Sequence, residues 1–512
     1  MTSASDPTTP LTPAEKALVE KINATMTREE VLDALKTHLQ TAAEIELATI
    51  PIYLYTYYSV NRGSSTGNTL TRADLFGNRA GSIIMSVAVE EMLHMTLVSN
   101  VIFALTGAPA QLYGKAPGVY PTGLPNHNPK GPVGPHGGTE VKIPLDKFCF
   151  DQLWHFLQIE YPEAADAPPE GDDWDTIGQF YSYIRCLISS DHVLDSDFRT
   201  GPAEHQIQPY NYSPNSIDTA YPTGQFDPWK LPPRQDGGPV MDYGAPPSAA
   251  EVAEYANAGD SHAGPEELIA VTCKLDALNA LDTICDQGEG SATPSGSAPT
   301  DDPSKTEESH YYKFLTLQSQ LEPYATTTEQ LPQVPAPPAP VDPGWTQEML
   351  ESENIVFNLP PNPVTRATGA GPDRFVYPED TAPISDFLNG LFQYQLLCIE
   401  TTYRVPPDQQ KRFFNESMHQ SMIWVMDGYC MMMRGIDVGD GYVMGPTFEN
   451  IDLGAPQDAF AALDALGKKA IQASALIPAA SGVPKSVAGT TGYNADNLGV
   501  AKSMPDISQY WR

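Results

Sequence analysis

Apolar residues recur at every third or fourth position in several long segments, the spacing that buries one face of an α-helix. The first such stripe runs from Leu35 and Leu39 to Tyr57, and strand-like alternation is almost absent. The pattern predicts an all-α protein. Its expected helices span residues 28–60, 79–106, 146–161, 175–190, 265–287, 305–321, 384–403 and 409–434, with a weaker helix over 456–475.

Several of these helices have recognisable ends. Thr27 precedes Arg-Glu-Glu, which is typical of a helix N-cap, and Gly107 follows the run that ends at residue 106. Pro51 lies inside the first long helix, and because proline removes a backbone donor we expect it to kink or split that helix.

Prolines and glycines separate the apolar runs. The chain has 49 prolines and 39 glycines, concentrated in residues 107–140, 199–250, 288–304 and 330–345, which we expect to be loops or linkers. The predicted organisation is an N-terminal segment (1–27), a four-helix bundle with long insertions (28–325), a Pro-rich linker (326–380), a helical hairpin packed on the bundle (381–440) and an irregular tail (441–512).

Ionisable residues interrupt the apolar faces of two predicted helices. Glu46 lies in the middle of the first stripe, and Glu91 and His94 lie three residues apart on the apolar face of the second helix. A buried carboxylate is costly unless it meets a cation or hydrogen-bond donors. Glu-x-x-His places a carboxylate and an imidazole on adjacent helical turns, near enough to bind one metal ion.

The same motif recurs at Glu307 and His310, at the start of a later apolar helix. Carboxylate di-iron sites in four-helix bundles take one Glu from each of two helices and a Glu-x-x-His from each of the other two. The sequence therefore predicts a metal site from Glu46 and the two Glu-x-x-His pairs, with two iron ions expected and manganese as the alternative metal.

A sixth ligand is expected between His94 and Glu307. Glu289 ends the helix that leads to Glu307, and a helical hairpin would bring the two level, so we favour Glu289 over the alternative, Glu160. A third Glu-x-x-His, at Glu416 and His419 near Glu400, offers a second site; we interpret it instead as part of a packed helical hairpin.

Charge and cysteine content restrict the function classes. The chain carries 64 acidic and 29 basic side chains, a formal net charge of −35, so nucleic acid and anionic membranes would repel it. No apolar run approaches the roughly 18 residues of a membrane span, and no secretory signal is evident. The six cysteines are scattered without a C-x-x-C motif, which favours a reducing compartment and a cytoplasmic location.

Four sequence blocks resemble the ferritin-like domain of iminophenyl-pyruvate dimer synthases. They read LQTAAEIELATIPIYLYTYYSV, VAVEEMLHMTLVSNVIFALTGAP, QGEG and ESHYYKF, and they fall within residues 30–320. Where members of that family read IGEFYE, this chain has IGQFYS at 177–182. The resemblance implies a ferritin-like fold and an oxidative coupling of imines derived from aromatic α-amino acids. It also implies functional roles for Glu46, Glu91, His94, Glu289, Glu307 and His310.

The leading hypothesis is a non-haem oxidase or oxygenase that uses O₂ and a small, aromatic amino-acid-derived metabolite. One alternative is a ferritin-like protein that binds metal without turnover. Another is a structural helical protein in which these acids and histidines only pair with one another. The sequence leaves open whether the chain works as a monomer or a homo-oligomer.

Overall fold

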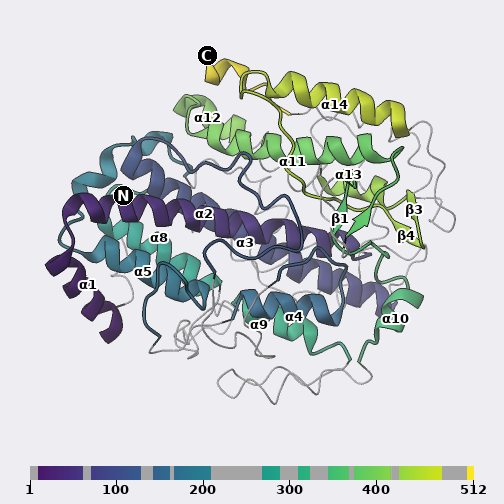
Figure 1. The fold of residues 1–512 in the computed structure, drawn as a ribbon, viewed down its shortest axis with the longest axis horizontal. Coiled ribbons are helices and arrows are strands. Elements are labelled where there is room, and N and C mark those ends of the chain that lie inside the picture. The colour runs from purple at the N-terminus through teal and green to yellow at the C-terminus, as the bar shows by residue number, and fades with distance from the viewer. Residues whose placement is uncertain are drawn as a thin grey trace.

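The computed structural model describes residues 10–61, 71–127, 142–161, 167–208, 268–288, 309–322, 344–367, 374–414, 417, 426–474 and 504–512. Two long helices run side by side through the middle of the molecule, α2 (Arg28–Ser59) and α3 (Arg72–Thr106) (Figure 1). Thr27 and Thr71 cap them, each in a reciprocal capping box with an acidic residue three positions on. This pair forms the first half of a helical bundle.

The second half of the bundle consists of two interrupted helices. α4 (Phe150–Ile159) packs against α9 (His310–Gln318), whereas α5 (Ile177–Ser189) packs against α8 (Lys274–Gln287). In Figure 1, α5 and α8 lie toward one end of the α2–α3 pair, and α4 and α9 lie farther along it. The backbone N–H of His310 donates to the carbonyl of Gly288 at 2.9 Å, so α9 resumes where α8 ends. Each interruption therefore falls near the middle of the bundle.

Additional helices surround this bundle. α1 (Pro13–Thr25) packs on α5, and α11 (Ala382–Thr402) packs against α14 (Ala459–Ser474). The remaining short elements are η1 (Asp195–Arg199), η2 (Ala203–His205), α10 (Gln347–Ser352), α12 (Pro407–Phe414), α13 (Met426–Met433) and η10 (Ser508–Trp511).

Strands are few and short in the described part of the chain. β1 (Pro363–Val364) pairs in parallel with β2 (Phe375–Val376), and β3 (Asp437–Gly439) pairs in antiparallel with β4 (Tyr442–Val443). One cluster of buried apolar side chains reaches from Ile22 to Ile507 and joins the bundle to the C-terminal helices. The prediction of an all-α bundle with additional C-terminal helices is confirmed. The predicted domain boundaries stay predictions.

Individual helices depart from expectation in several places. α1 and α10 were not predicted, α3 begins seven residues before residue 79, and α8 begins at Lys274 rather than 265. α2 runs unbroken through Pro51, so the predicted split is wrong. The predicted helix over 409–434 contains α12 and α13, and most residues between them lie outside the described part of the chain.

Among the described residues, α3 is the one helix that is long and apolar enough to resemble a membrane span. By length and composition it could cross a membrane, with a mean hydropathy of 1.3 over its best 18-residue window. That window is entirely buried inside the protein, because α2, α8 and α9 pack around it. Burial at the centre of a bundle thus accounts for its composition.

A glycine explains why the start of α3 is hidden in the sequence. Gly77 interrupts the apolar pattern, and a Cβ atom at this position would lie 2.7 Å from the backbone carbonyl oxygen of Asn61. The chain that follows α2 therefore approaches α3 too closely for any side chain at this point.

We expect Gly77→Ala to lower the free energy of unfolding by about 1–3 kcal/mol, because the crowded atom belongs to the backbone and cannot rotate away. Chemical denaturation would measure this loss. Ser82→Ala is the control, since Ser82 bonds only the Asn78 carbonyl of its own helix, at 2.9 Å. Equal stability of the two variants would contradict the close approach.

Candidate metal centre

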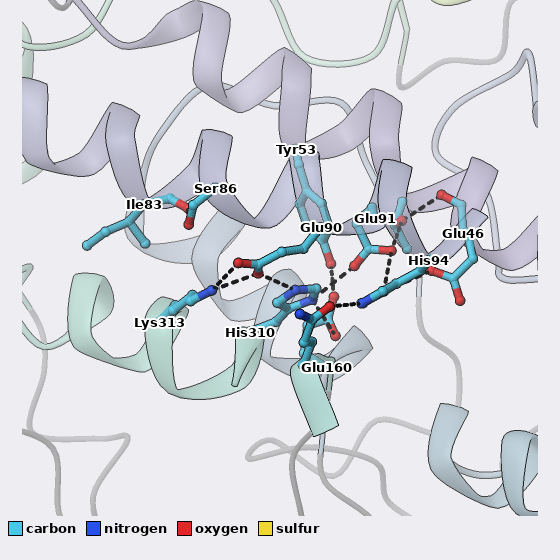
Figure 2. A network of polar contacts seen from close by, with 12 residues as sticks. Glu46, Tyr53, Ile83, Ser86, Glu90, Glu91, His94, Glu160, His310 and Lys313 are labelled. Atoms are coloured by element: carbon cyan, nitrogen blue, oxygen red, sulfur yellow. Dashed lines mark hydrogen bonds and ion pairs between the residues drawn. The ribbon is translucent and has the colours of Figure 1, made fainter. Parts of the chain in front are cut away.

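Five ionisable side chains from four helices converge where the bundle helices are interrupted. α2 contributes Glu46, α3 contributes Glu91 and His94, Glu160 is the C-cap residue of α4, and His310 opens α9 (Figure 2). None is more than 3% exposed. The side chains therefore meet in the interior.

Local sequence explains why each group lies at this level. Glu91 and His94 are three residues apart, so they project from one face of α3 on successive turns. α4 ends at Glu160 because residue 162 is proline, which disfavours helical conformation in the residue before it. α8 ends at Gly288, where an added Cβ would lie 4.0 Å from Glu160 Oε2.

The five side chains form two groups that share one carboxylate. Glu46, Glu91 and His94 make the first group, and Glu91, Glu160 and His310 make the second; within each, one potential ligand atom per residue lies within 4.8 Å of the others. The two imidazole rings stack at an interplanar angle of 23°, with centroids 5.4 Å apart. Two ion positions side by side would suit this arrangement.

Glu91 directs one carboxylate oxygen toward each histidine. Its Oε2 lies 3.9 Å from Nδ1 of His94, and its Oε1 lies 3.0 Å from Nδ1 of His310. The outer carboxylates complete the two groups: Glu46 Oε2 is 3.5 Å from Nδ1 of His94, and Glu160 Oε2 is 3.6 Å from Nδ1 of His310. Glu91 is thus the one carboxylate common to both groups.

Both histidines present Nδ1 to the carboxylates and use Nε2 for an outer contact. Nε2 of His94 lies 3.0 Å from Oε1 of Gln287, and Nε2 of His310 lies 2.8 Å from Oε2 of Glu90. An Nε2–H that donates outward leaves the Nδ1 lone pair directed into the cluster. Metal-binding histidines are held by such outer hydrogen bonds.

Hydroxyl groups hold the carboxylates in place. Tyr53 donates to Glu160, and Tyr181 donates to Glu46. Thr49 Oγ1 lies 3.0 Å from Glu91 Oε2 and 2.8 Å from the Glu46 backbone carbonyl oxygen, so its one proton is shared between two acceptors. A hydroxyl group therefore lies against each carboxylate, and burial beside these acids raises the pKa of both tyrosines well above the usual value.

Mutual repulsion and the histidines set the protonation of the cluster. Burial, reinforced by the charges of Glu46 and Glu160, raises the pKa of Glu91 well above its usual value. Burial would also raise the pKa of Glu46, but the hydrogen bond and charge of His94 lower it overall. Burial opposes the charged form of His310, yet Glu160 and the other neighbouring carboxylates raise the pKa of this imidazole well above normal.

A pocket reaches the cluster through the helix interruptions. It touches Glu46, Glu91, His94 and Glu160 on the inside. At its rim lie Ile177, Cys285 and Gly288, which are partly exposed and come from the start of α5 and the end of α8; the other lining residues are Ile45, Thr49, Gly178, Tyr181 and Ile284. The pocket is small, about 20 Å³, so it admits water-sized molecules to the carboxylates between the two interrupted helices.

The structure brings together four of the six residues predicted from the sequence: Glu46, Glu91, His94 and His310. Glu289 and Glu307 lie outside the described residues, so their positions stay predictions. Glu160, the alternative to Glu289, lies within the cluster.

Glu400, which we considered together with the third Glu-x-x-His motif, makes contacts to the backbone. Glu400 Oε1 accepts the backbone N–H groups of Leu112 and Tyr113, both at 2.7 Å, which fits the interpretation as a packing element. Glu416 and His419 lie outside the described residues.

Sequence reasoning missed the outer contacts of the centre. Gln287 and Glu90 were not singled out, although Glu90 adjoins Glu91 and Lys313 follows His310 by one helical turn. Tyr181 lies in the IGQFYS segment, whose Gln179 Oε1 accepts the backbone N–H of Thr176 at 3.1 Å and so caps α5. Only the spacing of Lys313 from His310 could have suggested a buried partner.

The donor set fits divalent cations such as iron or manganese. Three buried carboxylates and two imidazoles surround a common space, and Nδ1 of His310 makes no hydrogen bond of acceptable geometry despite complete burial. Carboxylate oxygens and imidazole nitrogens are ligands for these metals. A bound cation would compensate the repulsion among the three acids.

The structure is thus a helical bundle with a cluster of carboxylates and histidines buried between its helices. A ferritin-like family model matches residues 39–225 and 244–319, just over half of the chain. The chain therefore belongs to the ferritin-like family. Among solved structures, it is similar to a ferritin-like protein from Caulobacter vibrioides at 20% identity, covering 70% of this chain and 83% of that one, with a TM-score of 0.34. Comparison with curated proteins gives no match.

Metal binding at this centre should release protons and weaken as the pH falls. Glu91 and His310 have raised pKa values in the metal-free protein, and each must lose its proton to bind a cation. Each displaced proton makes the apparent affinity fall about tenfold per pH unit below the relevant pKa. Calorimetry with Zn²⁺ in buffers of different ionisation enthalpy measures the protons released, and binding without release would contradict the assignment.

Proposed function

We propose that this protein is a non-haem oxidoreductase whose active centre holds two iron ions, with manganese as the alternative metal. One observation carries the proposal: two acid–histidine groups share Glu91 at the inner end of a pocket. The pocket gives a water-sized molecule access to the carboxylate that both groups share.

The residues of the centre would divide the work between them. His94 and His310 would each bind one ion through Nδ1, Glu91 would bridge the ions, and Glu46 and Glu160 would bind at the outer sides. A bound pair of iron ions supplies the reduction of O₂ and the oxidation of an organic molecule. The protein would fix the ligands and exclude bulk water.

The pocket favours a small substrate with apolar surface. Its rim includes Ile177 and Cys285, and Ile45 and Ile284 line its wall. The resemblance to iminophenyl-pyruvate dimer synthases makes imines of aromatic α-amino acids the first candidates, with O₂ as the second substrate.

A cytoplasmic setting accords with this chemistry. The six cysteines are free thiols, as expected in a reducing compartment. The strongly negative charge supports small molecules rather than nucleic acid or membranes as partners. A homo-oligomer would be compatible with every residue assignment above.

A metal-binding protein without turnover is the alternative function. It would contain the same ligands and the same metal, but substrate would not change its reaction with O₂. A purely structural cluster, the third hypothesis, would contain no metal. Metal content separates the structural cluster from the other two, and substrate-dependent O₂ uptake then separates the enzyme from the binding protein.

Metal analysis is the first test. Protein from iron-supplemented cells should contain about two equivalents of iron, and Glu91→Ala/His94→Ala should lose both, because Glu91 serves both positions. His127→Gln is the control, since His127 lies outside the cluster and its Nε2 is 3.1 Å from the Asp175 carbonyl oxygen. Near-zero metal in the wild-type protein would overturn the proposal.

Oxygen consumption is the second test. With aromatic α-imino acids generated in situ, the iron-loaded protein should consume O₂ continuously, and His94→Ala should reduce the rate by at least about 100-fold if the ligand is essential. An O₂ electrode and product analysis measure the reaction. Iron-loaded protein that reacts with O₂ once and shows no substrate dependence would favour the binding protein instead.

A further inference from the structure

The two histidines of the centre differ in what holds their outer nitrogen. Nε2 of His94 contacts the neutral amide of Gln287 at 3.0 Å, whereas Nε2 of His310 contacts the carboxylate of Glu90 at 2.8 Å. Figure 2 shows Glu90 and Lys313 on the side of His310 away from His94. The two halves of the centre are therefore unequal in their outer contacts.

Glu90 belongs to a fully buried ion pair. Nζ of Lys313 lies 2.7 Å from both carboxylate oxygens, and the exposed fractions are 0% for Glu90 and 1% for Lys313. A lysine ammonium at the same short distance from both oxygens is the geometry of a charge pair, so Glu90 faces His310 as a carboxylate acceptor.

The two sides have the same kinds of inner group, although Glu91 lies 3.0 Å from Nδ1 of His310 and 3.9 Å from Nδ1 of His94. Each group has one histidine Nδ1, one oxygen of Glu91 and one outer carboxylate, and each outer carboxylate accepts a tyrosine hydroxyl. Glu46 has Tyr181 as its donor, and Glu160 has Tyr53. Among the described residues, the acceptor behind each histidine is thus the clearest difference between the sides.

An anionic acceptor changes a histidine ligand more than an amide does. A charge-assisted hydrogen bond is shorter and stronger than a neutral one. When a carboxylate accepts the Nε2 proton, electron density at Nδ1 increases and the imidazole becomes a stronger ligand. At a pH where both imidazoles are deprotonated, His310 should therefore hold a cation more firmly than His94.

We propose that the two metal positions are inequivalent, and that the position formed by Glu91, Glu160 and His310 fills first. Glu90, held in place by Lys313, is the positioning residue responsible. This inference rests on the proposed metal centre. It adds to that proposal an order of filling and a cause in two residues that are not themselves ligands.

Anaerobic titration of the metal-free, full-length protein with Co²⁺ tests the order. Calorimetry and the visible absorption of bound cobalt should show two steps, with Kd values at least about tenfold apart. His94→Ala should keep the first step, and His310→Ala should lose it. These two variants compare the positions directly and do not depend on the Glu90–Lys313 pair.

A variant of the outer pair tests the cause. Glu90→Gln with Lys313→Met removes both charges and leaves every candidate ligand in place, and it should weaken the first step by about 10–100-fold while changing the second little. Ser86→Ala is the matched control, because Ser86 is buried one turn before Glu90 and bonds only the Ile83 carbonyl, at 2.9 Å. Far-ultraviolet circular dichroism and thermal unfolding establish that each variant is folded.

The outcomes separate this inference from the proposed function. Two equal steps, a first step lost in His94→Ala but kept in His310→Ala, or an unchanged first step in the folded double variant would each overturn the inequivalence and leave the metal centre intact. Absence of Co²⁺ binding to the wild-type protein would overturn the metal centre itself.

Discussion

The burial of several carboxylates at one place inside an apolar bundle is the constraint on which the structure depends. Glu46, Glu91 and Glu160 lie together in the interior, where their charges repel and water cannot screen them. Hydroxyl donors and two histidines compensate part of this cost. The remainder is what a divalent cation would relieve, so the feature that most disfavours the empty fold is also the one that suits it to metal.

Interruption of two helices connects that interior to the outside. In an unbroken four-helix bundle, the side chains at this level would be sealed by the neighbouring turns. Here α4 ends at Glu160 and α8 ends at Gly288, and the pocket lies between these ends and the start of α5. The same interruptions place Glu160 and His310 at helix termini, so access and ligand placement arise from one structural device.

Outer contacts extend the centre beyond its candidate ligands. Nε2 of His94 joins α3 to Gln287 of α8, and Nε2 of His310 joins α9 to Glu90 of α3, which Lys313 of α9 also contacts. A buried ion pair adds little net stability compared with apolar packing. Its placement behind one histidine instead orients the His310 ring and sets a charge beside its outer nitrogen.

The sequence by itself determined the helical class and four members of the cluster, because both follow from periodicity: a helix that buries one stripe must bury any Glu or His within it, as at Glu46, Glu91, His94 and His310. Tertiary structure alone decided the rest. Glu160 and Gln287 end their helices, where periodicity carries no information about direction. Glu90 lies next to Glu91 and reads as its exposed neighbour until α9 is packed against it. Partners such as these are set by contacts between helices distant in sequence, which no local pattern records.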